Sequence, residues 1–262
     1  MKFRTKDTDV INFIKASGIT GGTEFNAVNY LVVALKNAGL WTNIKALYPF
    51  VGGNAEAHKY NLVNPIDTNA AFRLQFNGSV THDSSGVTFS SANGWANTFL
   101  VATTHLIANK TTLALYSGSP FSAATGGIDM GAAITTTRRE ELTIRSNLNG
   151  CGANINSTTN GAGSAGFINT DGTGFYFASR QTSTDLRMYK NGVLQSSATT
   201  TNNGTQSNIQ MYLGARNVTN VAQGFTGRNF ALALIGLDYT PAQTVDFYNI
   251  VQQYQTILNR QV

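Results

Sequence analysis

The feature that most constrains the fold is a period of two in the hydrophobic pattern between about Phe72 and Leu237. Asn191-Gly192 stands between two alternating segments, and this dipeptide favours a tight type I′ hairpin turn, because both central residues need a positive φ. Gly, Asn, Ser and Thr turns separate the other segments, and no helical pattern lies between them. Such a series of short strands is typical of an antiparallel β-sandwich or barrel. The segments are AFRLQFNG, GVTFSS, NTFLVA, TTLALYSG, EELTIRS, GFYFASR, LRMYKNG, VLQSSAT, NIQMYLGA and NFALALIGL.

Both ends of the chain carry helical patterns instead. Near the C-terminus, Thr240 is a strong N-cap candidate, since Pro follows at the first helical position and Gln stands three residues after the cap. We predict an N-terminal helical segment over residues 1–53, which docks on a partner or caps the sandwich. The sandwich itself is predicted over residues 54–262 and includes a C-terminal helix over residues 241–260. One face of the N-terminal segment carries apolar residues at helical spacing: Phe25, Val28, Leu31, Val32 and Leu35.

The composition narrows the classes of partner. Charged residues make up 12% of the chain, about half of the usual ~25%, and the net charge of +5 is scattered. A nucleic-acid surface usually needs clustered basic residues, so we expect no nucleic-acid partner. The opening MKFRTKDTDV lacks the apolar core of a signal peptide, and the longest apolar run, YLVVAL, is too short to span a bilayer. We expect a chain that is made in the cytoplasm and not inserted into a membrane.

Catalytic patterns are weak. A glycosidase on such a sandwich needs two acids about 5 Å apart on one side of the sheet. Glu140 and Glu141 are adjacent, so on a strand their side chains point to opposite faces, and no further acid follows two or four residues later. Cys151 has no local catalytic signature. The histidines stand apart and have no Cys or Glu at metal-ligand spacing: His58, His82 and His105. We therefore expect no enzyme, and no imidazole or thiolate metal site.

Several longer stretches resemble known proteins. GFYFASRQTSTDLRMYKNGVLQSS, IQMYLGA and the stretch from GFTGRNFALALIGLDY to the end resemble the latter half of a concanavalin A-like, laminin-G-type sandwich. FRLQFNGSVTHDSSGVTFSSANGWANT resembles the front half of that family, with Trp95 standing where a smaller aromatic is usual. NAVNYLVVALKNAGLWTNIKALYPFVGG resembles a lead segment of proteins from phages and prophages of Bacteroidetes hosts, including crAss-like phages.

The resemblance implies a fold and several candidate sites. The fold is mainly β, a concanavalin A-like antiparallel sandwich with an N-terminal helical segment and a C-terminal helix. Lectin-like sandwiches hold sugars with Asn, Asp and aromatic side chains of loops, which makes Asp83, Asn93 and Trp95 candidate glycan-binding residues. No cofactor is expected, although a calcium ion could bind at Asp171 or Asp185. The competing interpretation is that each Asp or Asn bonds its own turn and that Trp95 belongs to the core.

The resemblance also implies a biological setting. It indicates a non-enzymatic virion protein, a fibre, tail or head-decoration component made in the host bacterial cytoplasm without a signal peptide. Its partners would be other virion proteins or further copies of itself, contacted through the apolar helical face of residues 25–35. The alternative for that face is that it covers its own sandwich. Two other functions stay open: a carbohydrate-binding adhesin for host-surface glycan, and a glycan depolymerase.

Overall fold

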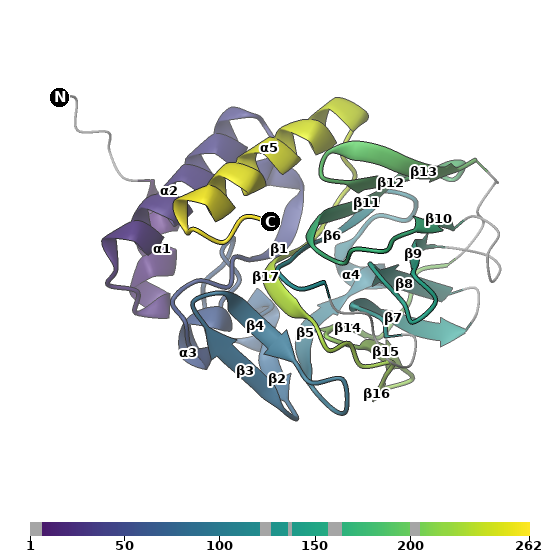
Figure 1. Cartoon of the computed structure of the whole chain (residues 1–262), viewed down its shortest axis with the longest axis horizontal. Coiled ribbons are helices and arrows are strands. Elements are labelled where there is room, and N and C mark those ends of the chain that lie inside the picture. Colours follow the sequence, from purple (N-terminus) through teal and green to yellow (C-terminus); the bar gives the residue numbers. More distant parts are fainter. Residues whose placement is uncertain (1–6, 121–126, 136–137, 157–163, 200–204) are drawn as a thin grey trace.

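The computed structural model describes residues 7–120, 127–135, 138–156, 164–199 and 205–262. Two β-sheets lie face to face and form the predicted sandwich (Figure 1). Strand β15 pairs with β7 in parallel, whereas the strands within the two sheets otherwise pair antiparallel. The helices are α1 (Thr8–Ser17), α2 (Gly22–Asn37), α3 (Ala55–His58), α4 (Ala102–His105) and α5 (Pro241–Ile257).

We call the first sheet sheet A. Its strands follow the order β13-β12-β11-β6-β17-β4-β3, and β1 also pairs with β17. The long helices α1, α2 and α5 lie on the outer side of this sheet (Figure 1). Its strands are β1 (Ile44–Tyr48), β3 (Val80–Asp83), β4 (Gly86–Phe89), β6 (Thr111–Ser117), β11 (Gly174–Thr182), β12 (Asp185–Lys190), β13 (Val193–Ala198) and β17 (Asn229–Gly236).

The second sheet is sheet B. Its strands follow the order β10-β9-β8-β7-β14-β5-β2, with β15 on β7 and β16 on β15. The edge strand β10 lies beside β13 of sheet A, where the Gly166 amide donates to the Ser196 hydroxyl at 3.1 Å. Its strands are β2 (Gln75–Asn77), β5 (Trp95–Val101), β7 (Met130–Thr135), β8 (Arg138–Thr143), β9 (Gly150–Ile155), β10 (Ala165–Ile168), β14 (Gln210–Leu213), β15 (Arg216–Val218) and β16 (Val221–Gln223).

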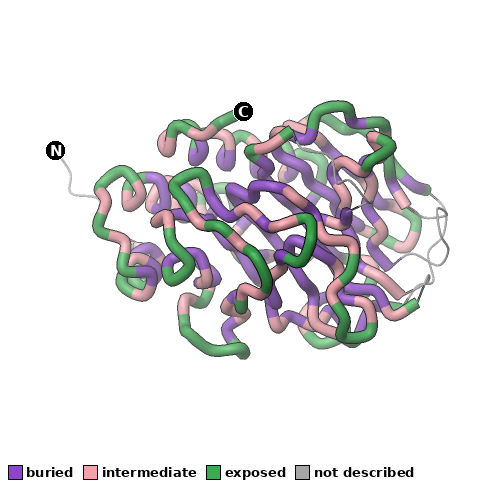
Figure 2. The backbone as a smooth tube through the Cα atoms, turned by 60° about the horizontal axis from the view of Figure 1, so that its bottom comes forward, coloured by how far each residue is buried: buried purple, intermediate pink, exposed green. Residues whose placement is uncertain are grey.

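The buried apolar side chains form two layers. Figure 2 shows along the backbone which residues are buried. The first layer lies between the sheets and includes Leu113 of β6, Leu142 of β8 and Leu213 of β14. The second layer lies between sheet A and the helices, and it joins Leu31 of α2 and Phe247 of α5 to the outer side of the sheet. The helices are therefore part of a continuous core and not an appendage.

The local signals that start and stop elements are mostly confirmed. Asn191 and Gly192, with φ of 49° and 74°, form the predicted turn between β12 and β13. Thr240 caps α5 with both hydrogen bonds of a capping box, and Gly18 ends α1 with a φ of 67°. Asp7 caps α1 through its side chain, and Gly21 precedes α2 without a side-chain cap.

The ten predicted segments miss seven strands: β1, β3, β7, β9, β10, β15 and β16. β1 is the one among them that lies in the predicted helical segment over residues 1–53, and its residues Ile44–Tyr48 pair with β17. Four of its five positions are buried, because both of its faces are covered. This short buried run lacks the alternation that identifies a half-exposed strand. The boundary predicted after residue 53 stays a prediction, and β1 on its N-terminal side belongs to sheet A.

Candidate functional site

The outer face of sheet B carries a line of polar side chains that runs across its strands. Directly paired residues on neighbouring strands point to the same side of a sheet. The residues of the intervening positions, such as Ala96, Met130 and Leu142, lie in the core between the sheets, so this line faces away from the core. We call it the outer-face row, and its members in strand order are Gln75, Asn97, Tyr212, Gly131, Glu141 and Asn154.

An aromatic pair stands at one side of the outer-face row. The rings of Trp95 and Tyr212 lie 4.1 Å apart between centroids with an interplanar angle of 31°. Tyr212 is buried beneath, with 5% exposure, while Trp95 keeps part of its ring in solvent. Trp95 pairs across the strands with Asn77, which is also half-buried. A partly exposed indole held by a second ring is a rigid apolar platform beside polar groups.

Amide side chains surround this platform. Asn97 Nδ2 donates to Gln210 Oε1 at 2.6 Å, and the Asn97 carbonyl oxygen accepts from the Phe99 backbone amide at 2.9 Å. Gln75 lies opposite Asn97 on the edge strand and is exposed. Amides offer both donors and acceptors, which matches the hydroxyl groups of sugars. The arrangement can therefore hold a neutral, hydroxyl-rich ligand against an aromatic ring.

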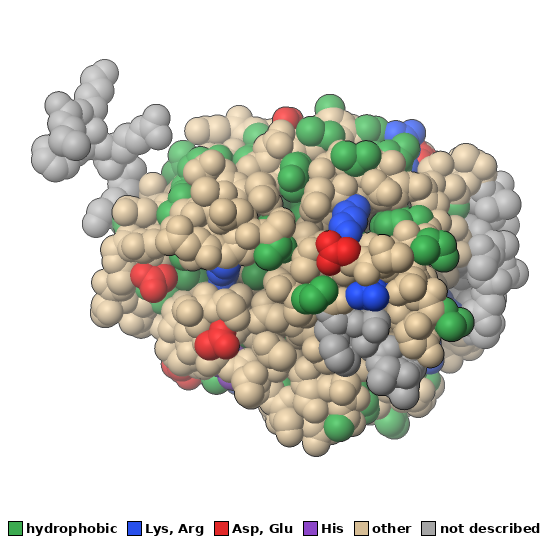
Figure 3. Space-filling model, viewed as in Figure 1, with side chains coloured by type: hydrophobic (Ala, Val, Ile, Leu, Met, Phe, Trp, Pro, Cys, Tyr) green, Lys and Arg blue, Asp and Glu red, His purple; other side chains and the backbone are tan. Residues whose placement is uncertain are grey.

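The other side of the outer-face row is charged. Glu141 Oε1 lies 3.1 Å from Arg216 Nη1, and Glu141 Oε2 lies 3.4 Å from Arg139 Nη1. The Glu141 side chain is 3% exposed, against 30% for Arg216. Elsewhere charged side chains are sparse, as Figure 3 shows for one side of the molecule. The outer-face row and the side chains next to it thus place an aromatic platform, amides and two guanidinium groups on one face of sheet B.

Of the three predicted glycan-binding residues, only Trp95 lies on this face. Asn93 stands in the turn before β5, where its Oδ1 accepts from the Ser79 amide at 3.0 Å. Asp83 ends β3 of sheet A, and its Oδ1 accepts from the amide and the hydroxyl of Ser85 at 2.7 and 2.5 Å. These bonds hold the pKa of Asp83 below its usual value. Asp83 therefore bonds within its own turn, Asn93 bonds the bend before β3, and the three residues are not brought together.

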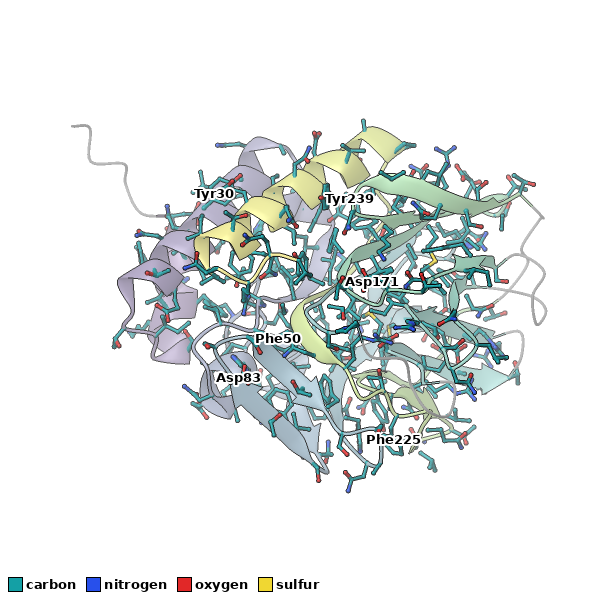
Figure 4. The ribbon with its side chains drawn as sticks, viewed as in Figure 1. Tyr30, Phe50, Asp83, Asp171, Phe225 and Tyr239 are labelled. Atoms are coloured by element: carbon teal, nitrogen blue, oxygen red, sulfur yellow. The ribbon has the colours of Figure 1, made fainter. Side chains whose placement is uncertain are left out.

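The two candidate calcium residues also lie apart. Asp171 contacts Lys190 at the end of β12, whereas Asp185 begins that strand. Figure 4 places Asp171 well away from Asp83. The Lys190 ammonium lies 2.7 Å from the Asp171 backbone oxygen, 3.0 Å from Asn169 Oδ1 and 3.8 Å from Asp171 Oδ2. A lysine thus stands among the oxygens that a calcium ion would use, and Asp185 is paired with Arg187 at 2.9 Å.

The apolar face of α2 lies against its own sandwich. Four of its five predicted contact residues have no exposed surface and belong to the layer between the helices and sheet A: Val28, Leu31, Val32 and Leu35. Phe25 is half-buried and lines a groove between α1 and α2, with Ile11 and Ile14. The sequence left two arrangements open for this helical face, docking on a partner or covering its own sandwich. In the structure the face covers its own sandwich.

The other predicted acids and histidines lie in separate places in the described part of the chain, apart from the contact between His58 and His82. Glu140 points into the protein, where Asn156 donates to it at 3.0 Å and the Ser207 amide at 3.1 Å. Burial raises the pKa of Glu140 to about 7. Within the described ranges, no three His, Cys, Asp or Glu side chains come close enough to hold a metal ion. His58 and His82 meet through Nδ1 atoms at 3.1 Å, far along the chain from either glutamate.

The sequence contains part of the signal for the outer-face row. Gln210 and Tyr212 alternate with core residues in NIQMYLGA, as Trp95 and Asn97 do in NGWANT. These alternations show which residues share a face within one strand. They do not show that β14 pairs with β5, because the two strands are separated by more than a hundred positions in the sequence.

Comparison with known proteins gives the fold. No protein family matches the chain in sequence, and no curated protein does either. Domain 4 of AbnA, a GH43 extracellular arabinanase from Geobacillus stearothermophilus, is similar in structure with a TM-score of 0.50 and 13% identity, over 79% of this chain and 98% of that one. The receptor-binding domain of botulinum neurotoxin C/D mosaic serotype is similar with a TM-score of 0.53 and 10% identity, over 80% of this chain and 51% of that one.

The binding domain of botulinum neurotoxin serotype D is similar as well, with a TM-score of 0.50 and 8% identity, over 80% of this chain and 52% of that one. This chain thus spans about half the length of the two neurotoxin domains. In the described residues, no helix is both long and apolar enough to cross a membrane. The chain is mainly β and has the antiparallel sandwich fold that lectin-like domains share.

Proposed function

We propose that this chain is a non-enzymatic glycan-binding module whose ligand lies on the outer face of sheet B. The observation that carries the proposal is the Trp95–Tyr212 pair, which stands among amide side chains on a sheet face that the long helices leave open. Sugar rings pack their C–H faces on such aromatic platforms, and amides bond the hydroxyl groups at the rim. Domain 4 of AbnA, which shares the fold, was solved in complex with arabinotriose.

Trp95→Ala tests the proposal directly. Wild-type chain should bind members of a glycan array that includes arabinotriose and bacterial surface polysaccharides. The variant should lose at least about tenfold in affinity for every glycan that binds, since a central aromatic anchor commonly contributes that much. Tyr30→Ala is the matched control, because Tyr30 is a half-buried aromatic on α2, away from sheet B (Figure 4). Equal affinity of wild type and Trp95→Ala would contradict the proposed site.

The finer setting is a phage virion, and this part of the proposal rests on the resemblance of residues 26–53 to proteins of Bacteroidetes phages and prophages. In that setting the chain is made in the host cytoplasm and becomes a fibre, tail or head-decoration component. It contacts other virion proteins or further copies of itself, and the sandwich faces host-surface glycan. Mass spectrometry of purified particles should find this chain at a fixed copy number. Its absence from the particles would remove the virion setting and leave glycan binding untouched.

The non-enzymatic part has its own test. Glu140 is enclosed by Asn156 and Ser207, and Glu141 is paired with two arginines, so neither carboxyl group faces a ligand on the outer-face row without rearrangement. We expect no release of reducing sugar from any polysaccharide that the chain binds. A release that Glu140→Gln or Glu141→Gln abolishes would instead establish the depolymerase alternative.

A further inference from the structure

The charged side of the outer-face row contains more hydrogen-bond donors than the protein uses. In the described part of the chain, five buried side-chain polar atoms have no hydrogen-bond partner, and two of them belong to the arginines that pair with Glu141: Arg139 Nε and Arg216 Nε. Arg138 Nε and Gln206 Nε2 are also without a partner, but these two residues lie with Glu140, whose side chain points into the protein. A buried donor without an acceptor costs free energy, and native proteins usually supply a partner. This part of the protein therefore has fewer hydrogen-bond acceptors than donors.

The charges on this face show the same imbalance. Arg139 and Arg216 both donate to Glu141 through Nη1, so two guanidinium groups share one carboxylate. Glu141 is 3% exposed, and its negative charge is already used by this pairing. The Arg216 side chain is 30% exposed, so its guanidinium group is only partly enclosed by the protein. The planar fork of a guanidinium group matches the two oxygens of a carboxylate or sulfate group.

The two guanidinium groups lie within reach of the aromatic platform. Gly131 of β7 pairs with Tyr212 on one side and with Glu141 on the other, and Arg216 is also in register with Gly131. Two strand spacings, about 10 Å, therefore separate the backbone of Tyr212 from that of Glu141. Gly131 between them is itself buried, so a ligand that reaches both sides contacts the partly exposed side chains of Trp95 and Arg216 and not the backbone of Gly131.

We propose that the outer-face row selects glycans that carry an anionic group, and that Arg216, supported by Arg139, binds this group. The inference rests on the proposed function, because it names the class of glycan for the same site. The anionic group is a carboxylate, as in a uronic acid, or a sulfate ester. Glu141 is the internal counter-ion that holds both arginines in place. The anionic group of the ligand supplies the further hydrogen-bond acceptors that the arginines lack.

The test compares matched polymers at about 0.15 M salt, where nonspecific attraction between exposed charges is largely screened beyond ~8 Å. Polygalacturonate is compared with fully methyl-esterified pectin, and dextran sulfate with dextran. The variants are Arg216→Gln, Glu141→Gln and Arg187→Gln, and the melting temperature of each shows that it folds. Arg187 is the matched control, since it is an arginine paired with one carboxylate, Asp185, on β12 of sheet A.

The proposal predicts opposite effects of the two site variants. Arg216→Gln should weaken binding of an acidic polymer about tenfold, as expected for one charge-assisted hydrogen bond. Glu141→Gln should strengthen it, because the arginines lose the internal negative charge that competes with the ligand. Arg187→Gln should change nothing. If polygalacturonate shows this pattern, the bound group is a carboxylate; if dextran sulfate shows it, the group is a sulfate ester.

Three outcomes would overturn the inference. In the first, neutral and acidic polymers bind with equal affinity and Trp95→Ala abolishes the binding of both. The proposed glycan binding would then be supported, and the selectivity for acidic glycans would be wrong. All three variants could weaken acidic binding alike, or single-stranded DNA could compete as well as the polymers, which would indicate nonspecific attraction of polyanions. If no polymer and no array glycan binds the wild type, the proposed function itself fails.

Discussion

The outer faces of the two sheets differ in what lies on them. On sheet A, apolar side chains such as Phe177 and Leu234 continue outward into a second core layer beneath α2 and α5. On sheet B, the corresponding outward positions carry amides, charged groups and the Trp95–Tyr212 pair. A covered face contributes to stability, whereas an uncovered face of the same fold can carry function. The comparison explains why the proposed site lies on sheet B.

The strands themselves reflect this difference. β17 is buried at every position and β6 likewise, because both sides of sheet A are covered there. β9 alternates between half-buried and buried positions, as expected for a strand with one face on the core. Continuous apolar runs and alternating runs can therefore be used to separate the covered sheet from the open one.

The largest effect should come from charging the covered side. Val28→Asp combined with Leu35→Lys places two charges in positions with no exposed surface, each costing several kcal/mol. We expect the isolated monomer to lose its cooperative thermal transition. Asn26→Asp with Asn37→Lys introduces the same charges at exposed positions of α2 and should leave the melting temperature nearly unchanged. A stable double variant that fails only in oligomer or particle assembly would mean that α2 docks on a partner.

A smaller effect should follow from truncating one ring of the covered layer. Phe247 of α5 packs against Phe177 and Tyr239, with ring centroids 5.6 and 5.5 Å apart, and it is fully buried. Phe247→Ala should lower the free energy of unfolding in urea by about 3–5 kcal/mol. A loss below about 1 kcal/mol would show that α5 adds little to the core.

Acid should weaken the contact between α3 and sheet A. His58 is buried, and this burial lowers its pKa from 6.5 to about 3, with His82 and Arg260 adding to the effect and Asp83 opposing it. Between pH 6.5 and pH 3 the unfolded chain protonates His58, whereas the native chain keeps it neutral. The contribution of His58 to the free energy of unfolding is therefore complete above pH 6.5 and decreases as the pH falls toward 3. The expected contribution is up to ~2 kcal/mol between pH 6.5 and pH 5.

Urea unfolding at a series of pH values measures this contribution. His58→Gln should flatten the slope of stability against pH, whatever its effect on stability at neutral pH. His105→Gln, on α4 and outside the contact between His58 and His82, should keep the wild-type slope. Equal slopes in all three proteins would contradict the assignment to His58.

The smallest stability effect should come from the open face. Trp95 is only half-buried and its main contact is the Tyr212 ring, so Trp95→Ala should cost about 1–2 kcal/mol of unfolding free energy, less than Phe247→Ala. The same substitution should weaken glycan binding by at least about tenfold. A loss of stability as large as that of Phe247→Ala would mean that Trp95 is a core residue and would weaken the case for a binding platform.

Local sequence signals determined much of the fold. The hairpin at Asn191-Gly192 and the cap at Thr240 depend on neighbouring residues only, and both were predicted at the correct positions. Alternation within the strands predicted an antiparallel sandwich or barrel, and the family resemblance favoured the sandwich. The pattern missed seven strands, among them β1, whose positions are nearly all buried, since a short buried strand has no contrast between its two faces.

The binding residues were only partly predictable. Trp95 stood out as an aromatic at a strand edge, whereas Asn97, Tyr212, Glu141 and Arg216 carry no local mark of function. Asp83 and Asn93 satisfied a compositional rule for lectin loops, but both side chains accept from backbone amides of turns, Asp83 within its own turn and Asn93 from Ser79 in the bend before β3. Short polar side chains do so whenever a turn offers a backbone amide, and the sequence cannot distinguish this from ligand binding.

Only the tertiary structure decided which distant residues share a surface. Pairing of β14 with β5 and β7 brings Tyr212 beside Asn97 and Gly131, and Lys190 reaches the oxygens around Asp171 from another strand. A strand's own sequence specifies which of its side chains point together, because the side-chain direction repeats every two residues. Its neighbours depend on which pairing buries the most apolar surface across the whole chain, and that is a property of the assembled sandwich.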